Sequence, residues 1–520
     1  MSRLAEVQNE EFDVAIVGGG IIGCGIARDA ALRGLRVALF ERRDFGSGTT
    51  AASTRIVHGG LRYLEMFDFR LVRLDLRERE TLLGIAPHLV RPLEFLIPFL
   101  GRDGTSPLKM RLGLALYDAL SFDKGLPSRR WLSAAEARMS DPALERTDVR
   151  GAAAYHDARA DSPERLALEN VLEAEEHGAR VRNYCEVVSS APGGGTVTRL
   201  RVRDTLDGVE ARLSARVLVN ATGAWFERTA VALTGRAPGR IRTTKGIHIV
   251  VPPVTAHALV LYSRVDRRLL FAIPRRGLTW IGTTDTDYHG DPADARATRA
   301  DVDYLIDSVR GIFPTLRREH VLFTTSGVRA LVRRSGTESS VSRMHKVVVG
   351  EPVAPPGVIS VLGGKITGYR AIAEEVTDAV CRHLRLERES STAARPLPGA
   401  RPTHTVPASA PHLYDLYGTR AAAVVDLARS TPGLDRPLSP KYPDIAAQVV
   451  FAVRAEHCAT LADFLRRRTL LGASEDQGLD AAAAAARLMA AELGWTDSRL
   501  EAEIDSYRRD VAGTQAFRTG

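Results

Sequence analysis

Residues 14–23, with the sequence VAIVGGGIIG, decide the fold of this chain. The apolar run at 14–17 is typical of a buried parallel strand, and the six residues after it match the pattern GxGxxG. In such a turn Gly18 permits the tight bend, Gly20 lets backbone amides approach a pyrophosphate, and Gly23 lets a helix pack closely on the strand. The stretch therefore predicts the opening of a dinucleotide-binding fold.

The residues that follow support this interpretation. A helix is predicted from about residue 23 to 33, with its N-terminus directed at the phosphates, and a second strand from 36 to 40. That strand ends on Glu41, close to the spacing of about 20 residues at which an acid binds ribose hydroxyls. The glycine pattern alone is a weak signal, but strand, glycines, helix, strand and acid in this register make a strong one.

The position of this unit favours FAD over NAD as the dinucleotide. It opens the chain, and a long interval separates it from the next comparable strand, at 217–219. The turn Asn220-Ala221-Thr222-Gly223 after that strand is similar to the second cofactor contact of two-dinucleotide-fold flavoproteins. We therefore expect FAD as the cofactor.

Composition places the chain among globular proteins of several domains. Its 520 residues are too many for one core, and 44% of them are hydrophobic and 26% charged. The net charge of +8 is mild for this length and fits an anionic substrate, an anionic membrane surface or neither. No dense Lys/Arg block occurs, which argues against nucleic-acid binding. The four cysteines are too far apart in sequence for a CxxC pair or a metal framework, so we expect free thiols and no metal site.

Hydropathy bears on the location of the protein. The N-terminal residues lack the apolar core of a signal peptide, and no run reaches the roughly 18 apolar residues of a spanning helix. We expect a cytoplasmic protein, or one bound to the cytoplasmic face of the cell membrane. Two apolar segments with basic neighbours, 92–100 and 110–120, could dip into a headgroup region, although buried core is the preferred interpretation.

Several separated segments give the chain a family resemblance. The most specific are HGGLRYLE at 58–65 and SGVR at 326–329. On these segments the chain resembles the FAD-dependent glycerol-3-phosphate dehydrogenases, within the D-amino-acid-oxidase-like flavoproteins, from residue 12 to about residue 385. Arg55 stands where a lysine is common, Gly368 where a threonine is common and Ala330 where a proline often occurs. The other matching segments are 18–41, TTAASTR at 49–55, KGIHIV at 245–250, IGTTD at 281–285 and GGKITGYR at 363–370.

The resemblance implies a reaction. It implies oxidation of sn-glycerol 3-phosphate to dihydroxyacetone phosphate, with the hydride passing to the flavin and the electrons to a membrane quinone. Peripheral membrane association and a homodimer are both compatible with it. Three alternatives stay open: a glycerol-3-phosphate oxidase that uses oxygen, an amino-acid oxidase on the same fold, and a flavoprotein retained as a binding or interaction module.

Residue types and the resemblance together suggest the substrate site. His248 is the expected base, since imidazole has a reference pKa of about 6.5 and can take the hydroxyl proton. Cations must hold the phosphate, and we expect two or three basic side chains to do so, with Arg329 near the reacting carbon. The predicted substrate-binding residues are Arg62, Tyr63, Thr284, Asp285, Arg343 and Lys365.

The cofactor site is predicted from the glycine turn, from the second contact and from the loop that wraps the flavin in the family. The predicted FAD-binding residues are Gly18, Gly20, Gly23, Glu41, Arg42, Thr49, Thr50, Ser53, Arg55, His58, Val187, Ala221, Gly223, Trp225, Gly364 and Lys365.

The predicted fold class is α/β, with an α+β substrate domain inserted in the dinucleotide fold. The FAD-binding domain is assigned to 12–90, 150–235 and 320–385, and the substrate domain, with an antiparallel sheet, to 91–149 and 236–319. Residues 386–411 are rich in Ser, Thr, Ala and Pro and are predicted as a linker. Residues 412–520 show helical spacing and are predicted as a helical domain, on which Arg466, Arg467 and Arg468 form a solvated face.

Overall fold

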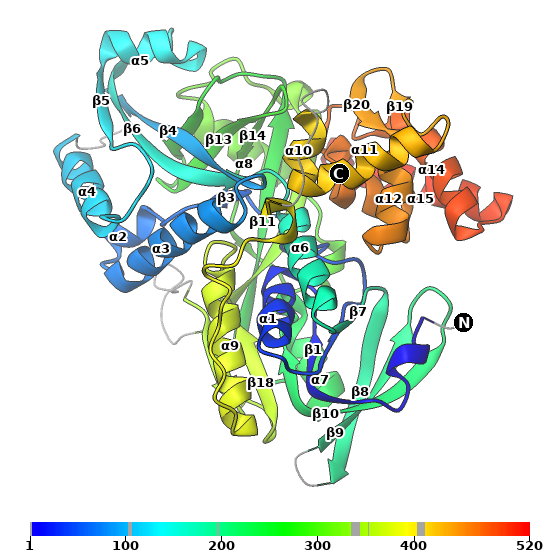
Figure 1. The fold of residues 1–520 in the computed structure, drawn as a ribbon. Helices are drawn as coiled ribbons and strands as arrows, with labels where there is room; N and C mark the ends of the chain where they lie inside the picture. Colours follow the sequence, from blue (N-terminus) through cyan, green and yellow to red (C-terminus); the bar gives the residue numbers. More distant parts are fainter. Residues whose placement is uncertain are drawn as a thin grey trace.

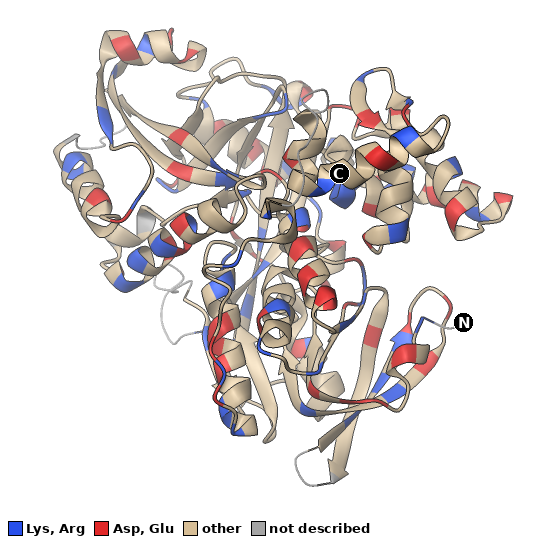
Figure 2. Ribbon diagram, viewed as in Figure 1, with Lys and Arg blue, Asp and Glu red and all other residues tan. Residues whose placement is uncertain are grey.

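The structure is a computed structural model of the 520-residue chain. It describes residues 3–101, 107–194, 197–333, 344–351, 353–402 and 411–519, and only the backbone of Arg62, Glu65 and Pro107. Two β-sheets lie next to each other, and a helical C-terminal region packs beside them (Figure 1). Basic and acidic residues are interspersed along the helices and strands (Figure 2). This arrangement confirms the predicted fold class.

The first sheet is built around the strand predicted at the start of the chain. Its strands are β1 (Glu11–Val17), β2 (Val37–Phe40), β7 (Arg180–Arg182), β8 (Cys185–Gly194), β9 (Val197–Asp204), β10 (Glu210–Asn220), β17 (Lys346–Val349) and β18 (Val358–Leu362). A parallel core runs in the order β18-β10-β1-β2-β7, with β17 antiparallel at one edge and β8 and β9 as an antiparallel extension of β10. The parallel core brings the carboxyl ends of β1, β2 and β10 to one edge.

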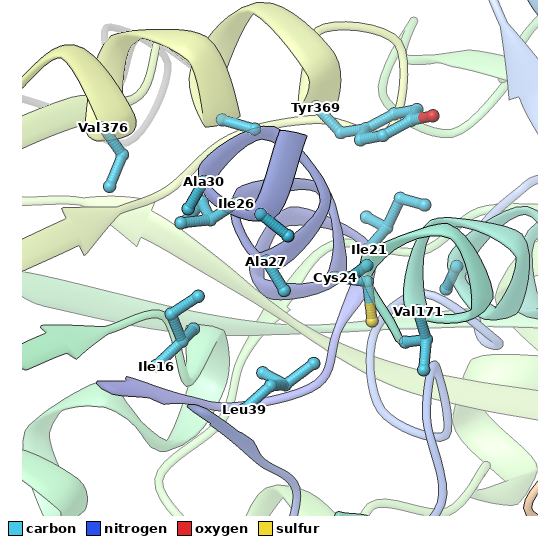
Figure 3. Close-up of a cluster of buried hydrophobic side chains, with 14 of the residues drawn as sticks. Ile16, Ile21, Cys24, Ile26, Ala27, Ala30, Leu39, Val171, Tyr369 and Val376 are labelled. Carbon is cyan, nitrogen blue, oxygen red and sulfur yellow. The ribbon is translucent and has the colours of Figure 1, made fainter. Parts of the chain in front are cut away.

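Helix α1 (Ile21–Leu32) packs on this sheet, in contact with α6 (Pro163–Glu176) and α9 (Tyr369–Leu384). Small residues permit the close approach: a Cβ on Gly25 would lie 3.0 Å from the Cδ2 atom of Tyr369. The helix begins at Ile21, two residues before the predicted start, because Gly20 is its N-cap and Gly23 lies inside its first turn. Figure 3 shows the buried cluster, in which Ile26, Ala27 and Ala30 of α1 lie among Ile16, Leu39, Val171, Tyr369 and Val376.

The second sheet is mainly antiparallel. Its strands are β3 (Ile56–Val57), β4 (Val90–Leu100), β5 (Arg130–Ser133), β6 (Val149–Ala160), β11 (Ile241–Val251), β12 (Ala258–Tyr262), β13 (Leu269–Arg275), β14 (Leu278–Gly282), β15 (Thr286–Asp287) and β16 (Phe323–Val332). Their order is β15-β11-β14-β13-β12-β4-β6-β3, with β16 alongside β11 and β5 alongside β6; β12 and β4 are parallel. The strands that alternation predicts at 258–261, 269–273 and 278–283 are confirmed as β12, β13 and β14.

Helices cover both faces of the second sheet. On one face α8 (Arg299–Val309) joins the core, and on the other α2 (Arg62–Glu65), α3 (Phe69–Ile85) and α4 (Pro107–Leu120) pack over β4, β6 and β12. Strands β3, β6 and β16 belong to this sheet, although they fall within the ranges predicted for the FAD-binding domain. The second sheet therefore draws strands from several separate stretches of the chain. Two further helices are α5 (Ala134–Ser140) and α7 (Phe226–Thr234).

The C-terminal region has its own hydrophobic core. The helical spacing predicted at 446–453, 481–493 and 498–512 is confirmed, whereas the β19–β20 hairpin was not predicted. The elements are α10 (Pro411–Tyr417), α11 (Ala421–Ser430), β19 (Pro437–Ser439), β20 (Tyr442–Ile445), α12 (Ala446–Ala455), α13 (Leu461–Asp463), a π-helical turn (Phe464–Arg468), α14 (Leu479–Leu493) and α15 (Asp497–Gly513).

The prediction of a solvated arginine face in this region was wrong. Arg466 is half-buried, with its guanidinium over the ring of the buried Tyr507. Arg468 is 1% exposed, and both Arg467 and Arg468 form ion pairs with the buried carboxylate of Asp44. Sequence spacing cannot reveal such a partner, because Asp44 belongs to the first sheet's loops, far away along the chain.

Two negative findings hold within the described ranges. No helix there is long and apolar enough to cross a bilayer. In the same ranges, no group of three or more His, Cys, Asp or Glu side chains is placed to bind a metal ion.

Candidate active site

A cavity of about 500 Å³ lies between the two sheets. At one end it is lined by the glycine turn after β1 and by Glu41, and His248, Arg329 and Lys365 also belong to its lining. Ligands of open parallel sheets bind outside the carboxyl ends of the strands, which is where the first end lies. The cavity thus joins the predicted cofactor and substrate residues in one space.

The glycine turn leaves room for a phosphate group. Gly18 has φ +105°, and a Cβ there would lie 2.9 Å from the carbonyl oxygen of Ala221. A Cβ on Gly23 would lie 1.9 Å from the carbonyl oxygen of Gly18, so this glycine sets the contact between helix and strand. A Cβ on Gly20 would meet only the Thr50 Oγ1 atom, at 3.7 Å, on the side that faces the cavity. Because Gly20 caps α1 without a side chain, the helix N-terminus presents backbone amides to an anion, as a pyrophosphate requires.

Glu41 is fixed at the end of β2. Its carboxylate accepts hydrogen bonds from the backbone N–H groups of Gly19, at 2.7 Å, and Arg43, at 2.8 Å. Burial raises the pKa of Glu41, and the two amides oppose this by favouring the charged form. Arg42 and Val187 line the same end of the cavity. The glycine cradle and an oriented acid are the groups that the diphosphate and ribose of FAD need, so the residues present fit this cofactor.

His248, on β11, lies between two threonine side chains. Its Nε2 atom is 3.1 Å from Thr54 Oγ1, and its Nδ1 atom is 3.3 Å from Thr325 Oγ1. Burial, together with the charges of Arg329 and Arg55, lowers the pKa of His248 to about 3. The imidazole is therefore neutral near pH 7 and can accept a proton.

Arg329, on β16, packs against β11. A Cβ on Gly246 would lie 2.3 Å from Arg329 Nη2, so only glycine leaves space for the guanidinium. Arg329 donates to Thr283 Oγ1 at 2.8 Å and to the carbonyl oxygen of Thr284 at 3.1 Å, and it pairs with Asp285 at 3.3 Å. These contacts fix the guanidinium beside the cavity.

Thr284 and Asp285, two predicted substrate residues, lie behind Arg329 rather than in the cavity lining. The Thr284 side chain is 2% exposed and accepts a hydrogen bond from the backbone N–H of Ile247 at 3.0 Å. Asp285 also pairs with Arg268, at 2.9 Å. Their contacts orient Arg329, and Thr283 lines the cavity in their place.

Lys365 follows two glycines with positive φ, Gly363 and Gly364, and reaches the cavity beside Tyr63. Its Nζ atom lies 3.8 Å from the centre of the Tyr63 ring and forms an ion pair with Asp75 on α3. Burial raises the pKa of Asp75 to about 6. Asp75 was not predicted as a site residue, because an acid within an amphipathic helix carries no local signal of such a partner.

The other predicted residues are in different surroundings. Arg55, with φ +61°, makes a two-pronged ion pair with Glu164 on α6, at 2.5 and 2.7 Å, a geometry that lysine could not reproduce. Gly23 packs against the turn outside the cavity lining, and the side chain of Arg62 and all of Arg343 lie outside the described residues. The predicted FAD residues that line the cavity are Gly18, Gly20, Glu41, Arg42, Thr49, Thr50, Ser53, Arg55, His58, Val187, Ala221, Gly223, Trp225, Gly364 and Lys365.

Comparison with known proteins defines the class of the molecule. Residues 13–379 match the family described as FAD dependent oxidoreductase, and residues 390–500 match the C-terminal domain of alpha-glycerophosphate oxidase. The chain is thus an FAD-dependent oxidoreductase.

More specifically, the chain belongs to the glycerol-3-phosphate dehydrogenase family. It is 39% identical to a glycerol-3-phosphate dehydrogenase of Synechocystis, over 98% of this chain and 97% of the relative. It is 36% identical to glycerol-3-phosphate dehydrogenase 2 of Mycobacterium tuberculosis H37Rv, over 96% and 88%. The crystal structure of the Bacillus halodurans glycerol-3-phosphate dehydrogenase complexed with FAD is similar, with a TM-score of 0.76 and 27% identity over 98% of this chain and 97% of that one.

Proposed function

We propose that the protein oxidises sn-glycerol 3-phosphate to dihydroxyacetone phosphate and passes the electrons to a membrane quinone. The observation that carries this proposal is that His248, Arg329 and Lys365 line the same cavity, so that a neutral base and two cations face one space. A phosphorylated secondary alcohol needs both features, a proton acceptor at the hydroxyl and positive charge at the phosphate.

Each of these three residues has a separate task in this proposal. FAD supplies the hydride acceptor when bound. Lys365 holds the phosphate, together with the predicted cations Arg62 and Arg343, while Arg329 orients the oxygen on the reacting carbon. His248 takes the hydroxyl proton through the nitrogen that faces Thr54. The negative charge of the substrate raises the pKa of His248, since it opposes the neighbouring arginines.

An anaerobic reduction experiment tests the substrate assignment. Purified protein that contains FAD is mixed with glycerol 3-phosphate, then in a separate cuvette with a D-amino acid, and the flavin absorbance is followed. Bleaching by glycerol 3-phosphate alone supports the proposal. Bleaching by the amino acid instead favours an amino-acid oxidase, and no bleaching by either leaves a flavoprotein with another role.

The acceptor is tested in the same preparation. We expect reduced protein to be reoxidised rapidly by a water-soluble quinone analogue and slowly by oxygen. Hydrogen peroxide formed in stoichiometric amounts during turnover in air would instead identify a glycerol-3-phosphate oxidase.

The outer face of α4 supports the membrane part of the proposal. Leu108, Leu112 and Leu116 are 66%, 66% and 39% exposed, and their spacing of four residues places them in one stripe. Lys109 and Arg111 fall on either side of this stripe at 100° per residue. A leucine stripe flanked by basic residues is typical of a helix that lies in the interface of an anionic bilayer.

The surroundings of α4 extend this leucine stripe and connect it to the cavity. Phe122 follows the helix, and Met66, Phe67 and Phe69 follow α2, which contacts α4; all four side chains are exposed. On the buried face, the Tyr117 hydroxyl accepts a hydrogen bond of 2.9 Å from the backbone N–H of Gly59. Gly59 belongs to the loop 58–60, whose residues His58 and Gly60 line the cavity. The helix that we propose to dock on lipid therefore also supports the substrate end of the site.

A further inference from the structure

We propose that the C-terminal domain is a clamp that retains FAD, acting through the buried carboxylate of Asp44. The proposal rests on the placement of the FAD ribose at Glu41. Two segments flank that end of the cavity: the loop 42–46, which follows Glu41, and the turn 183–184, which precedes β8 and Val187. One stretch of the C-terminal domain, residues 457–468, holds both.

The loop 42–46 is packed directly on the glycine turn. The backbone N–H of Gly46 donates to the carbonyl oxygen of Gly19 at 2.8 Å, and the N–H of Gly19 donates to the Glu41 carboxylate. A Cβ on Gly19 would lie 2.7 Å from the Phe45 ring. Displacement of this loop would therefore also displace the turn that cradles the diphosphate and the acid that meets the ribose.

Two consecutive arginines of the C-terminal domain hold the loop from its other side. The fully buried carboxylate of Asp44 accepts hydrogen bonds from Arg467 Nε at 2.6 Å and from Arg468 Nη1 and Nη2 at 2.7 and 2.8 Å. Their charges hold the pKa of Asp44 well below its usual range. Successive residues of an α-helix point about 100° apart, and here the π-helical turn brings both to one carboxylate. Beside them, the Phe45 ring meets the His457 ring edge-on, with centroids 5.7 Å apart.

The turn 183–184 is held by the same stretch. Asn183 Nδ2 donates to Asp44 Oδ1 at 3.0 Å and to the carbonyl oxygen of His457 at 2.8 Å. The Tyr184 hydroxyl donates to Asp463 Oδ1 at 2.7 Å. Its backbone N–H donates to the carbonyl oxygen of Arg43 at 2.8 Å, which ties the turn to the loop. Asp44 is thus the point where the loop, the turn and the C-terminal domain meet.

The clamp predicts that FAD affinity depends on a side chain that need not touch FAD. The variant Asp44→Asn keeps the shape of the side chain. It removes the carboxylate that pairs with the buried Arg468, and it leaves Arg467 with Asp463 as its remaining charge partner. We expect the dissociation constant of FAD to rise about tenfold or more, since removing one partner of a buried charge pair strongly destabilises the segments that the pair joins, here the loop that supports the glycine turn. Released FAD is measured by its fluorescence after dilution of the purified protein, without substrate, so the result is independent of the reaction catalysed.

A matched control separates the clamp from general loss of stability. Glu456 forms an equally buried ion pair with Arg165 on α6, and both side chains are 0% exposed, but its carboxylate contacts neither the loop nor the turn. We expect Glu456→Gln to lower the thermal unfolding midpoint while it retains FAD. Equal release of FAD by Asp44→Asn and Glu456→Gln at the same thermal stability would overturn the proposal, and so would normal retention by Asp44→Asn. If Asp44→Asn does not fold, the variant Arg467→Gln, which leaves Arg468 in place, is used instead. Weaker FAD binding by this variant supports the clamp, and unchanged binding refutes it.

Discussion

The guanidinium of Arg329 occupies the space that a side chain on Gly246 would take, because a Cβ there would come within 2.3 Å of Nη2. Gly246 is thus part of the site without any functional group of its own. It lets the Arg329 guanidinium lie against β11, where it bonds to Thr283, Thr284 and Asp285.

Gly246→Ala is therefore expected to displace Arg329 and to lower kcat/KM for glycerol 3-phosphate by about 100-fold, since small misplacements at a reacting centre have effects of this size. FAD content, read from the flavin absorbance, should not change. The control is Gly84→Ala on α3, where a Cβ would meet nothing within 4 Å. Full activity in Gly246→Ala would show that the position of Arg329 does not matter for turnover.

His248→Gln tests the base. The amide can still hydrogen-bond to Thr54, but it cannot take a proton, so we expect the rate of flavin reduction to fall by about 100- to 10,000-fold. Stopped-flow absorbance under anaerobic conditions measures that step directly. The exposed residue His289 provides the control variant His289→Gln. A loss of less than about tenfold in His248→Gln would assign the base to another group.

The sequence predicts the cofactor-binding turn better than it predicts the contacts of the substrate site. The glycine turn, the strand ends and the acid at Glu41 are all local patterns, and each could be predicted because every part lies within about thirty residues of the next. The contacts of His248 with Thr54 and Thr325, of Lys365 with Asp75 and of Asp44 with Arg468 join distant segments. No spacing rule links such pairs, and a buried arginine has the same sequence signature as an exposed one. This is also why the arginines at 466–468 were predicted as a solvated face.

The lowered pKa of His248 also makes the free energy of unfolding depend on pH. Burial lowers the pKa of His248 in the folded protein to about 3, below its ordinary value of 6.5. As the pH falls, the unfolded chain therefore takes up this proton first. The stability present above about pH 6.5 is lost progressively toward pH 3, by at most about 1.4 kcal/mol per pH unit from this residue.

Urea unfolding at about pH 7.5 and about pH 5.5, with FAD in excess, measures this effect. We expect the free energy of unfolding to fall less between the two pH values in His248→Gln than in the wild-type protein. An equal fall in both proteins would mean that His248 titrates near its ordinary pKa in the folded state.

The exposed stripe on α4 leads to the last prediction. Leu112 is at its centre and 66% exposed, so Leu112→Glu should disturb the fold little while placing a negative charge against an anionic bilayer. Because burial of a leucine contributes about 1.5–3 kcal/mol, we expect binding to vesicles that contain anionic phospholipid to weaken by about tenfold or more. Cosedimentation with these vesicles measures the effect, and added salt should weaken wild-type binding in the same assay.

The matched control is Leu206→Glu. Leu206 is an exposed leucine in the turn between β9 and β10, at 42% exposure. Equal binding by Leu112→Glu and the wild-type protein would mean that α4 is not the docking helix. A membrane quinone would then have to approach the flavin from another face of the protein.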